Sequence, residues 1–305
     1  MRDTGYFKQA KLLLQVLPYF EKQGHFALKG GTAINLFLRE MPRLSVDIDL
    51  TYLPVNPRDE ALSNISRSLK EVAAQVRKVL GAKVDEQTLK GTDYTVKMTV
   101  RQADATIKVE PNLVLRGSIY PPVQEKLCKK AEKEFELSVS TKVLSLADIY
   151  GGKICAALDR QHPRDFFDVK LLLEKEGLTD EIRRAFVVYL ASHDRPMNEL
   201  LKPKWKDIKS VFEKEFKGMT LEPVELNDLL ETRDELLRLI HKGLKDKEKK
   251  FLLSLKDGEP DWTLLDLPNI ERLPGLQWKL ENIRRMSPKK RQEQSVLLRK
   301  ALNEK

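Results

Sequence analysis

FALKGGTAINLF (residues 26–37) and the segment after it, RLSVDIDLTYL (residues 43–53), decide the fold of this chain. The apolar residues that open the first segment predict a short strand, which runs into Gly30 and Gly31. Two glycines permit a tight turn, and Thr32 is a good N-cap for the apolar helix predicted after it. The second segment alternates apolar and polar residues, which is typical of a strand. Together the two segments predict a strand, a turn, a helix and a second strand.

Outward from these segments, the pattern of apolar residues is mixed at first and helical later. Helical spacing precedes them, and it returns over residues 58–80. Two further strands are predicted over residues 94–100 and 105–109, and from Ser145 onward the spacing is helical almost to the end of the chain. Strands early and helices late predict an α+β fold, with a small mixed sheet followed by a mostly helical C-terminal lobe.

A chain of 305 residues is long enough for two domains. We expect the first domain over residues 1–190, with an α/β core that ends at about residue 120 and a helical block that carries Lys153 and Asp168. The helical C-terminal lobe is expected over residues 191–305.

The charge of the chain favours a polyanionic partner. Charged residues make up 33% of the sequence, and 55 Lys and Arg against 46 Asp and Glu give a net charge of +9. A basic surface of this kind attracts nucleic acid. Charge alone does not identify the partner.

Several classes of protein are disfavoured by the residues that the sequence lacks. Cys128 and Cys155 form neither a disulfide framework nor a zinc-ligand pair, which favours a reducing, cytoplasmic setting. No run approaches the roughly 20 apolar residues that span a bilayer, so we expect no membrane partner. The four histidines lack an HxxxH spacing, so oxygen atoms would have to hold any metal ion. The motifs of P-loop, Rossmann, serine-hydrolase and zinc-protease proteins are missing too.

Asp47 and Asp49 are the first candidates for chemistry. Alternation along a strand places both side chains on one face, next to the glycine turn. Carboxylates supply the hard oxygen ligands that Mg²⁺ prefers, and a glycine turn that opens a helix offers N–H groups to phosphate oxygens. The alternative is an exposed strand with two solvated aspartates, beside an ordinary helix-start turn.

The order and spacing of these pieces resemble a known family. The two opening segments, with ADIYGGKICAALDR (residues 147–160) and RDFFD (residues 164–168), resemble the nucleotidyltransferases of the AbiEii/AbiGii toxin family, in the polymerase-β-like superfamily. The resemblance implies a polymerase-β-like core. It also implies transfer of a nucleoside monophosphate from an NTP to an acceptor hydroxyl, an activity of the EC 2.7.7 type.

The resemblance further implies the metal ligands. In that superfamily the two acids of the DxD pair and a third acid from a neighbouring strand bind two Mg²⁺ ions, which assigns Asp47 and Asp49 directly. Glu110 stands at the end of a predicted strand and is the candidate for the third acid. The alternative for Glu110 is an ordinary exposed glutamate at a strand end.

The family also uses a serine before the first aspartate, a lysine in the helical block and an aspartate after it. The expected catalytic residues are therefore Asp47, Asp49, Lys153 and Asp168, and the expected nucleotide-binding residues are Gly30, Gly31, Thr32, Ser45, Lys153 and Arg160. Lys153 lies in an apolar helical run, where burial demands a negative partner. The NTP, Asp165 and Asp168 all stay open as that partner, and the two aspartates are spaced to share one helix face.

The acceptor and the partners are implied by the resemblance together with the charge. Relatives modify the 3′ end of tRNA and thereby block translation, and they are encoded beside an antitoxin, often of the AbiEi type. We therefore expect a toxin with an RNA acceptor, most simply tRNA, in a toxin–antitoxin or phage-defence system. Two alternatives stay open: nucleotidylation of a protein, and a non-catalytic protein of the same fold that binds nucleic acid or the antitoxin.

Overall fold

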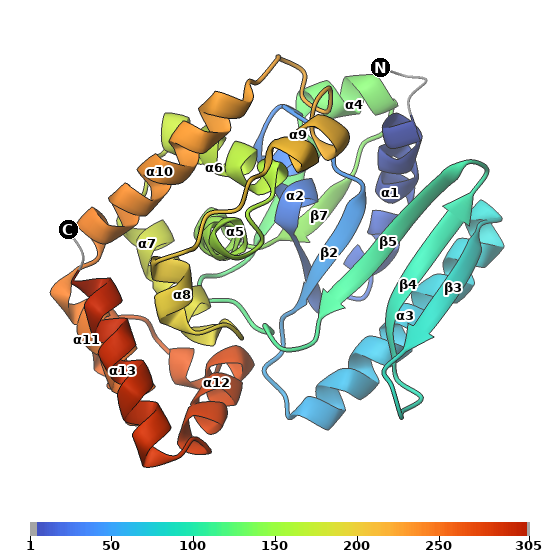
Figure 1. Ribbon diagram of the computed structural model, residues 1–305. Helices are drawn as coiled ribbons and strands as arrows, with labels where there is room; N and C mark the ends of the chain where they lie inside the picture. The colour runs from blue at the N-terminus through green and yellow to red at the C-terminus, as the bar shows by residue number, and fades with distance from the viewer. Residues whose placement is uncertain (1–4, 304–305) are drawn as a thin grey trace. The chain divides into compact units, whose positions relative to one another are not determined.

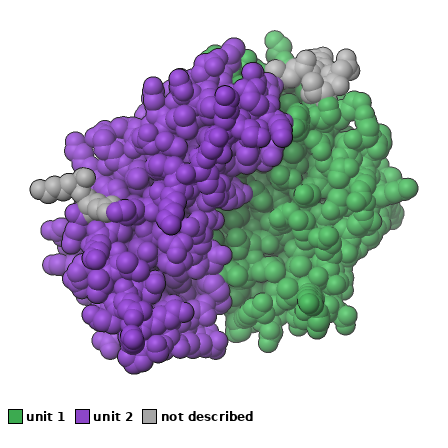
Figure 2. All heavy atoms as spheres, viewed as in Figure 1, with its two compact units in different colours: residues 1–145, 219–222 green, residues 146–218, 223–305 purple. Residues whose placement is uncertain are grey.

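A computed structural model describes residues 5–303 of the chain. The chain forms two compact units, which Figure 2 shows in green and purple. The first unit contains the chain up to Ser145 together with Met219–Glu222. The second unit contains Leu146–Gly218 and the chain from Pro223 onward.

A seven-stranded mixed sheet forms the centre of the first unit, in the order β3-β4-β5-β2-β1-β7-β6 (Figure 1). Its strands are β1 (Phe26–Lys29), β2 (Asp47–Tyr52), β3 (Lys83–Thr88), β4 (Thr95–Gln102), β5 (Ala105–Asn112), β6 (Val123–Lys126) and β7 (Ser140–Val143). The β2/β5 and β1/β7 pairs are parallel, and the other pairs are antiparallel. The predicted α+β class and mixed sheet are confirmed, and β3, β6 and β7 are strands that the sequence pattern did not reveal.

Two long helices pack on this sheet, α1 (Gly5–Glu21) and α3 (Arg58–Leu80), and a shorter helix, α4 (Lys129–Phe135), follows β6. In β2, Ile48 and Leu50 are fully buried, while Asp47 and Asp49 between them stay partly exposed. Burying an aliphatic side chain of this size contributes about 1.5–3 kcal/mol. The apolar face of the sheet therefore stabilises the fold, and the other face is left to the acids.

The connection after β1 differs from the prediction in one respect. Gly30 has a φ of +72°, which the tight turn requires. The assigned helix nevertheless begins at this residue and not after Thr32, as α2 (Gly30–Thr32) followed by the π-helix η1 (Ala33–Leu38). Thr32 has helical angles, φ −66° and ψ −44°, and its side chain caps no N–H group. The predicted N-cap role of Thr32 is wrong, because its hydroxyl donates to the backbone oxygen of Asp47 on β2 instead.

Helices build the second unit, as predicted for the C-terminal lobe (Figure 1). The α-helices are α5 (Leu146–Arg160), α6 (Pro163–Lys175), α7 (Asp180–Ser192), α8 (Met197–Leu201), α9 (Lys209–Glu215), α10 (Leu226–Gly243), α11 (Asp246–Lys256), α12 (Pro274–Arg284) and α13 (Pro288–Leu302), with short 3-10 helices η2 (Trp262–Leu265) and η3 (Ile270–Arg272). A Cβ placed on Gly151 would lie 2.8 Å from Ala185 Cβ, so this glycine lets α5 and α7 pack closely.

The compact units are divided at a different place from the expected domains. Residue 190, the expected end of the first domain, lies inside α7, and packing groups the chain from Leu146 with the later helices. A compact unit need not be a domain that folds on its own. The expected domain boundary at residue 190 therefore stays a prediction. None of the helices within residues 5–303 combines the length and the apolar character that a bilayer span requires.

Candidate functional site

A pair of hydroxyls ties the turn after β1 to the start of β2. Thr32 Oγ1 lies 2.6 Å from the backbone oxygen of Asp47 and 3.0 Å from Ser45 Oγ. A carbonyl oxygen only accepts, so Thr32 donates its single hydrogen to Asp47, and Ser45 donates to Thr32. Because Thr32 is buried, loss of its hydroxyl would remove a hydrogen bond from an enclosed polar contact. The contact holds the backbone at the first aspartate of the DxD pair.

The two glycines leave room for the neighbouring polar side chains. A Cβ placed on Gly30 would overlap Asp49 Oδ2. A Cβ placed on Gly31 would lie 2.7 Å from Arg43 Nη2 and 3.0 Å from Ser45 Oγ. The turn can approach these groups only because both positions lack a side chain. Every predicted site residue of the first unit except Glu110 is thus gathered around this turn.

The register of the sheet places Glu110 next to Asp49. In the parallel β2/β5 pair Asp49 lies opposite Glu110, and in the β1/β2 pair it lies opposite Lys29. Residues opposite each other in register project to the same face of a sheet. Glu110 is also ion-paired with Lys97 of β4. Glu110, the predicted third acid, therefore lies beside Asp49 in the sheet, and it is paired with Lys97, a lysine that the sequence analysis missed.

The chemistry of these residues fits Mg²⁺. Within residues 5–303, no group of three or more His, Cys, Asp and Glu side chains is close enough to hold a metal ion by itself. Mg²⁺ does not require such a cage, because it is commonly bound by one or two carboxylates together with waters and substrate phosphates. Asp47 and Asp49 are the predicted pair and lie on one face of β2, and their role as metal ligands stays a prediction. Glu110 as a further ligand stays a prediction, since Lys97 already neutralises it.

In the second unit a buried cluster forms around Lys153. Its Nζ lies 2.9 Å from Asp165 Oδ1 and 3.0 Å from Asp168 Oδ2, and Arg160 Nη2 lies 2.9 Å from the same Asp165 oxygen. The Lys153 side chain is 8% exposed and that of Asp168 is 0% exposed. Both aspartates that were open as partners of Lys153 therefore bind it.

The N-terminal turn of α6, the helix that carries Asp165 and Asp168, is fixed by local contacts. Pro163 occupies the first turn of α6, and the ring of His162 accepts a hydrogen bond from the Arg164 N–H group, 3.1 Å away. Asp165 and Asp168 follow one turn apart and so face the same way. This local arrangement was predictable from their spacing, and the contact with Lys153 of α5 was one of the partners left open in the sequence analysis.

Charge balance sets the ionisation of this cluster. Burial by itself raises the pKa of Asp165, but the adjacent Lys153 and Arg160 outweigh burial, and the pKa of that carboxyl is below its usual value. Asp165 is therefore ionised at neutral pH. Arg160 has a side chain that is 62% exposed, so it extends positive charge from the buried cluster to solvent.

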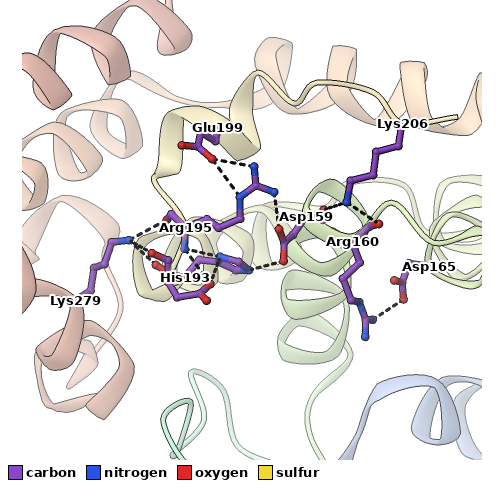
Figure 3. A network of polar contacts seen from close by, with 9 residues as sticks. Asp159, Arg160, Asp165, His193, Arg195, Glu199, Lys206 and Lys279 are labelled. Atoms are coloured by element: carbon purple, nitrogen blue, oxygen red, sulfur yellow. Dashed lines mark hydrogen bonds and ion pairs between the residues drawn. The ribbon is translucent and has the colours of Figure 1, made fainter. Parts of the chain in front are cut away.

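A polar network that the sequence analysis missed holds the end of α5 (Figure 3). Arg195 Nη1 donates to Asp159 Oδ1 over 2.6 Å. Lys279 Nζ donates to the backbone oxygens of His193 and Arg195, at 2.5 and 2.9 Å. Asp159 immediately precedes Arg160, so the network fixes the residue that binds Asp165. Partners so distant along the chain leave no local signal in the sequence.

The predicted site residues thus form two clusters, each within one unit. Gly30, Gly31, Thr32, Ser45, Asp47, Asp49 and Glu110 belong to the first unit, and Lys153, Arg160 and Asp168 belong to the second. Action of both clusters on one substrate stays a prediction.

Comparisons with known proteins place this geometry in context. A family model described as the nucleotidyl transferase AbiEii toxin of type IV toxin–antitoxin systems matches residues 11–282. Among solved structures, the chain is similar to MenT4, a nucleotidyltransferase toxin from Mycobacterium tuberculosis H37Rv, with a TM-score of 0.62 and 16% sequence identity. That match covers 90% of this chain and 93% of the other, and it shows a shared fold. No curated protein sequence matches the chain.

Proposed function

The chain belongs to the AbiEii family of nucleotidyl transferase toxins of type IV toxin–antitoxin systems, and from this premise we propose that it transfers a nucleoside monophosphate to RNA. The donor is an NTP, the acceptor is the 3′ hydroxyl of tRNA, and the result is a block in translation. The observation that carries the proposal is the close fit of the glycine turn against Asp49, with Thr32 holding the backbone of Asp47.

The residues of the first unit have separate roles in this proposal. The first N–H groups of a helix lack an intrahelical acceptor, so those of α2 are suited to the triphosphate, with Ser45 beside them. Asp47 and Asp49 hold Mg²⁺. When bound, the ion neutralises phosphate charge and lowers the pKa of the acceptor hydroxyl. Glu110 is proposed as a further carboxylate for this ion.

Lys153, Arg160 and Asp168 are proposed to act on the phosphates from the second unit. Lys153 supplies positive charge to the triphosphate as negative charge develops on it during transfer. Asp168, which is fully enclosed, holds the lysine in place. Arg160 is the member of the cluster that solvent reaches most freely, and it is suited to bind an anion.

The acceptor and the partners rest on charge and on the family. A net charge of +9 favours RNA over a neutral substrate. A type IV toxin has an antitoxin partner, and we propose one of the AbiEi type. We place the protein in the cytoplasm, where NTPs and tRNA occur. Cys128 and Cys155 are free thiols, which suits a reducing compartment.

A transfer assay tests the function. The protein is incubated with each of the four α-labelled NTPs, Mg²⁺ and total tRNA, and the label on RNA is measured with and without ribonuclease. Asp47→Asn should reduce transfer by at least about 10²–10³-fold, as expected for loss of transition-state charge stabilisation. The matched control is Asp85→Asn, an aspartate on β3 of the same sheet that pairs with Arg101 at the surface.

The outcomes separate the alternatives. Label that ribonuclease releases, and that Asp47→Asn abolishes, supports the proposal. Label that survives ribonuclease identifies a protein acceptor. Full transfer by a folded Asp47→Asn variant would overturn the assignment of the acids, and tRNA binding without any label would identify a non-catalytic protein.

A further inference from the structure

Four cations gather around the turn that follows α11 in the second unit. Lys256 ends α11, Arg284 ends α12, and Lys290 and Arg291 lie in the first turn of α13. Both α12 and α13 contact α11, and Figure 1 shows α11 and α13 side by side. Arg284 Nε donates to the backbone oxygen of Gly258 over 3.1 Å, and a Cβ placed on this glycine would lie 3.1 Å from Arg291 Nη1. We call these four residues the α11 cation cluster.

Lys256 is the unusual member of this cluster. It is 2% exposed, yet among residues 5–303 its ammonium group forms no hydrogen bond and no ion pair. A nearly enclosed cation without such a partner loses most of its hydration, which is destabilising. Burial first, and then the charge of Lys290, lower the pKa of Lys256, which is the mark of an environment without a counter-ion.

The backbone around Lys256 offers no substitute partner. A lysine in the last turn of a helix can donate to the terminal carbonyl groups. Here the oxygens of Leu253, Ser254 and Leu255 accept from the N–H groups of the following turn, at 2.9 to 3.0 Å. The oxygen of Gly258 is occupied by Arg284. These four oxygens therefore already accept from other donors, and Lys256 donates to none of them.

Carboxylates do not balance the cluster either. Asp257 and Glu259 lie in the same turn, and Glu293 follows on α13. In the part of the chain that the structure describes, none of these acids forms an ion pair with the four cations. The neighbouring Lys279, whose ammonium binds three carbonyl oxygens, adds further positive charge. The turn thus presents several positive charges to an external anion.

We propose that the α11 cation cluster binds backbone phosphates of the RNA acceptor. This inference rests on the proposed function for the presence of RNA, and it adds a place where RNA is held. Lys290 is exposed and Arg291 is half-buried, so the cluster opens to the surface at the start of α13. Cations spread over the ends of three helices suit the successive phosphates of a polynucleotide, which repeat along the strand. Lys256 contacts the phosphate that enters deepest.

Equilibrium binding of tRNA tests the inference. Fluorescence anisotropy with labelled total tRNA, without NTP, is measured between 50 and 200 mM KCl. The double variant Lys290→Gln/Arg291→Gln should weaken binding about fivefold or more. The slope of the logarithm of the binding constant against the logarithm of the salt concentration should become shallower by roughly one for each phosphate that the variant no longer binds. The control is Arg299→Gln/Lys300→Gln, which removes the same charge from the same helix about 15 Å away. The control should change the affinity less than about twofold.

Lys256→Met provides a second test, because RNA binding and a purely structural role predict different changes in stability and in tRNA affinity. Removing a buried cation that lacks a partner should leave the urea midpoint unchanged or raise it, while it weakens tRNA binding. A purely structural lysine would lower the midpoint and leave the affinity unchanged. A parallel thermal denaturation with inorganic phosphate separates a free anion from RNA. Stabilisation of the wild type by phosphate, with unchanged tRNA affinity in all variants, would overturn the assignment to RNA.

Other outcomes are equally decisive. An equal loss in the cluster and control variants would show that diffuse charge, rather than this turn, binds RNA, and would overturn the inference. Transfer to RNA by the wild type, together with normal tRNA binding by the cluster variants, would overturn the inference and leave the proposed function intact. Loss of tRNA binding in the cluster variants, without transfer by the wild type, would support the inference and overturn the function.

Discussion

Replacing Lys153 by Met should destabilise the second unit strongly. The change removes the ammonium group that lies 2.9 Å from Asp165 and 3.0 Å from Asp168 and leaves both enclosed carboxylates. Removing one partner of a buried ion pair costs about 3–5 kcal/mol. Arg160 retains its hydrogen bond to Asp165, so we expect a loss of about 4 kcal/mol rather than more. That is a large share of the roughly 5–15 kcal/mol by which proteins are stable.

The pH dependence of this loss follows from the pKa of Asp165. In the wild type this pKa is below its usual value, so the stabilisation is complete above the unfolded pKa and is lost as the pH falls through the folded pKa. In Lys153→Met, burial is opposed only by Arg160, and the pKa of Asp165 rises. Protonation then relieves the buried charge. The difference in unfolding free energy should therefore be largest near pH 7 and should narrow toward pH 5.

Tryptophan fluorescence in urea measures this loss directly. Trp205, Trp262 and Trp278 are the three tryptophans of the chain, and all belong to the second unit, as does Lys153. Their emission therefore follows the unfolding of that unit. The control is Lys170→Met on α6, which removes a surface pair with Glu174 and should cost at most about 0.5 kcal/mol. A loss below about 1 kcal/mol in Lys153→Met, or a difference that widens on acidification, would refute the reasoning.

Three further predictions concern the turn after β1 and the network in Figure 3. Gly30→Ala should cost about 1 kcal/mol or more in urea unfolding and reduce transfer, because the position has a φ of +72° and the added Cβ overlaps Asp49. Unchanged transfer would show that Asp49 tolerates displacement. Thr32→Val should lower the unfolding free energy by about 1–3 kcal/mol because the donor to Asp47 is removed, while Thr32→Ser retains most of it; equal losses would contradict the hydrogen-bond assignment. Burial lowers the pKa of Lys279 to about 8, so the unfolded chain binds more protons than the folded chain between that pH and the usual lysine pKa. The stability of the wild type should therefore rise with pH over this interval in urea titrations, and a Lys279→Met variant that shows the same rise would exclude this lysine as its source.

The residues close together in sequence were placed correctly from the sequence. The period of two along a strand puts Asp47 and Asp49 on one face, and β2 confirms the strand. The glycines predicted a tight turn, and Gly30 has the left-handed backbone that the turn needs. The order of strand and helix patterns along the chain predicted the mixed sheet and the helical lobe.

Side-chain partners from distant elements were decided by the tertiary structure. Thr32 was predicted to cap a helix, but packing of the turn against β2 offers its hydroxyl the backbone oxygen of Asp47. Glu110 is paired with Lys97 because β4 happens to be the strand beside β5. Lys153 binds both aspartates rather than one of them.

The physical reason for this division is the range of each interaction. Backbone conformation and the direction of a side chain depend on residues a few positions away, so spacing and glycine content in the sequence determine them. An ion pair or hydrogen bond depends on which elements become neighbours, and the burial of many apolar side chains determines that together. The chemistry of the acids was therefore set by local sequence, and their partners were set by the packing of the whole fold.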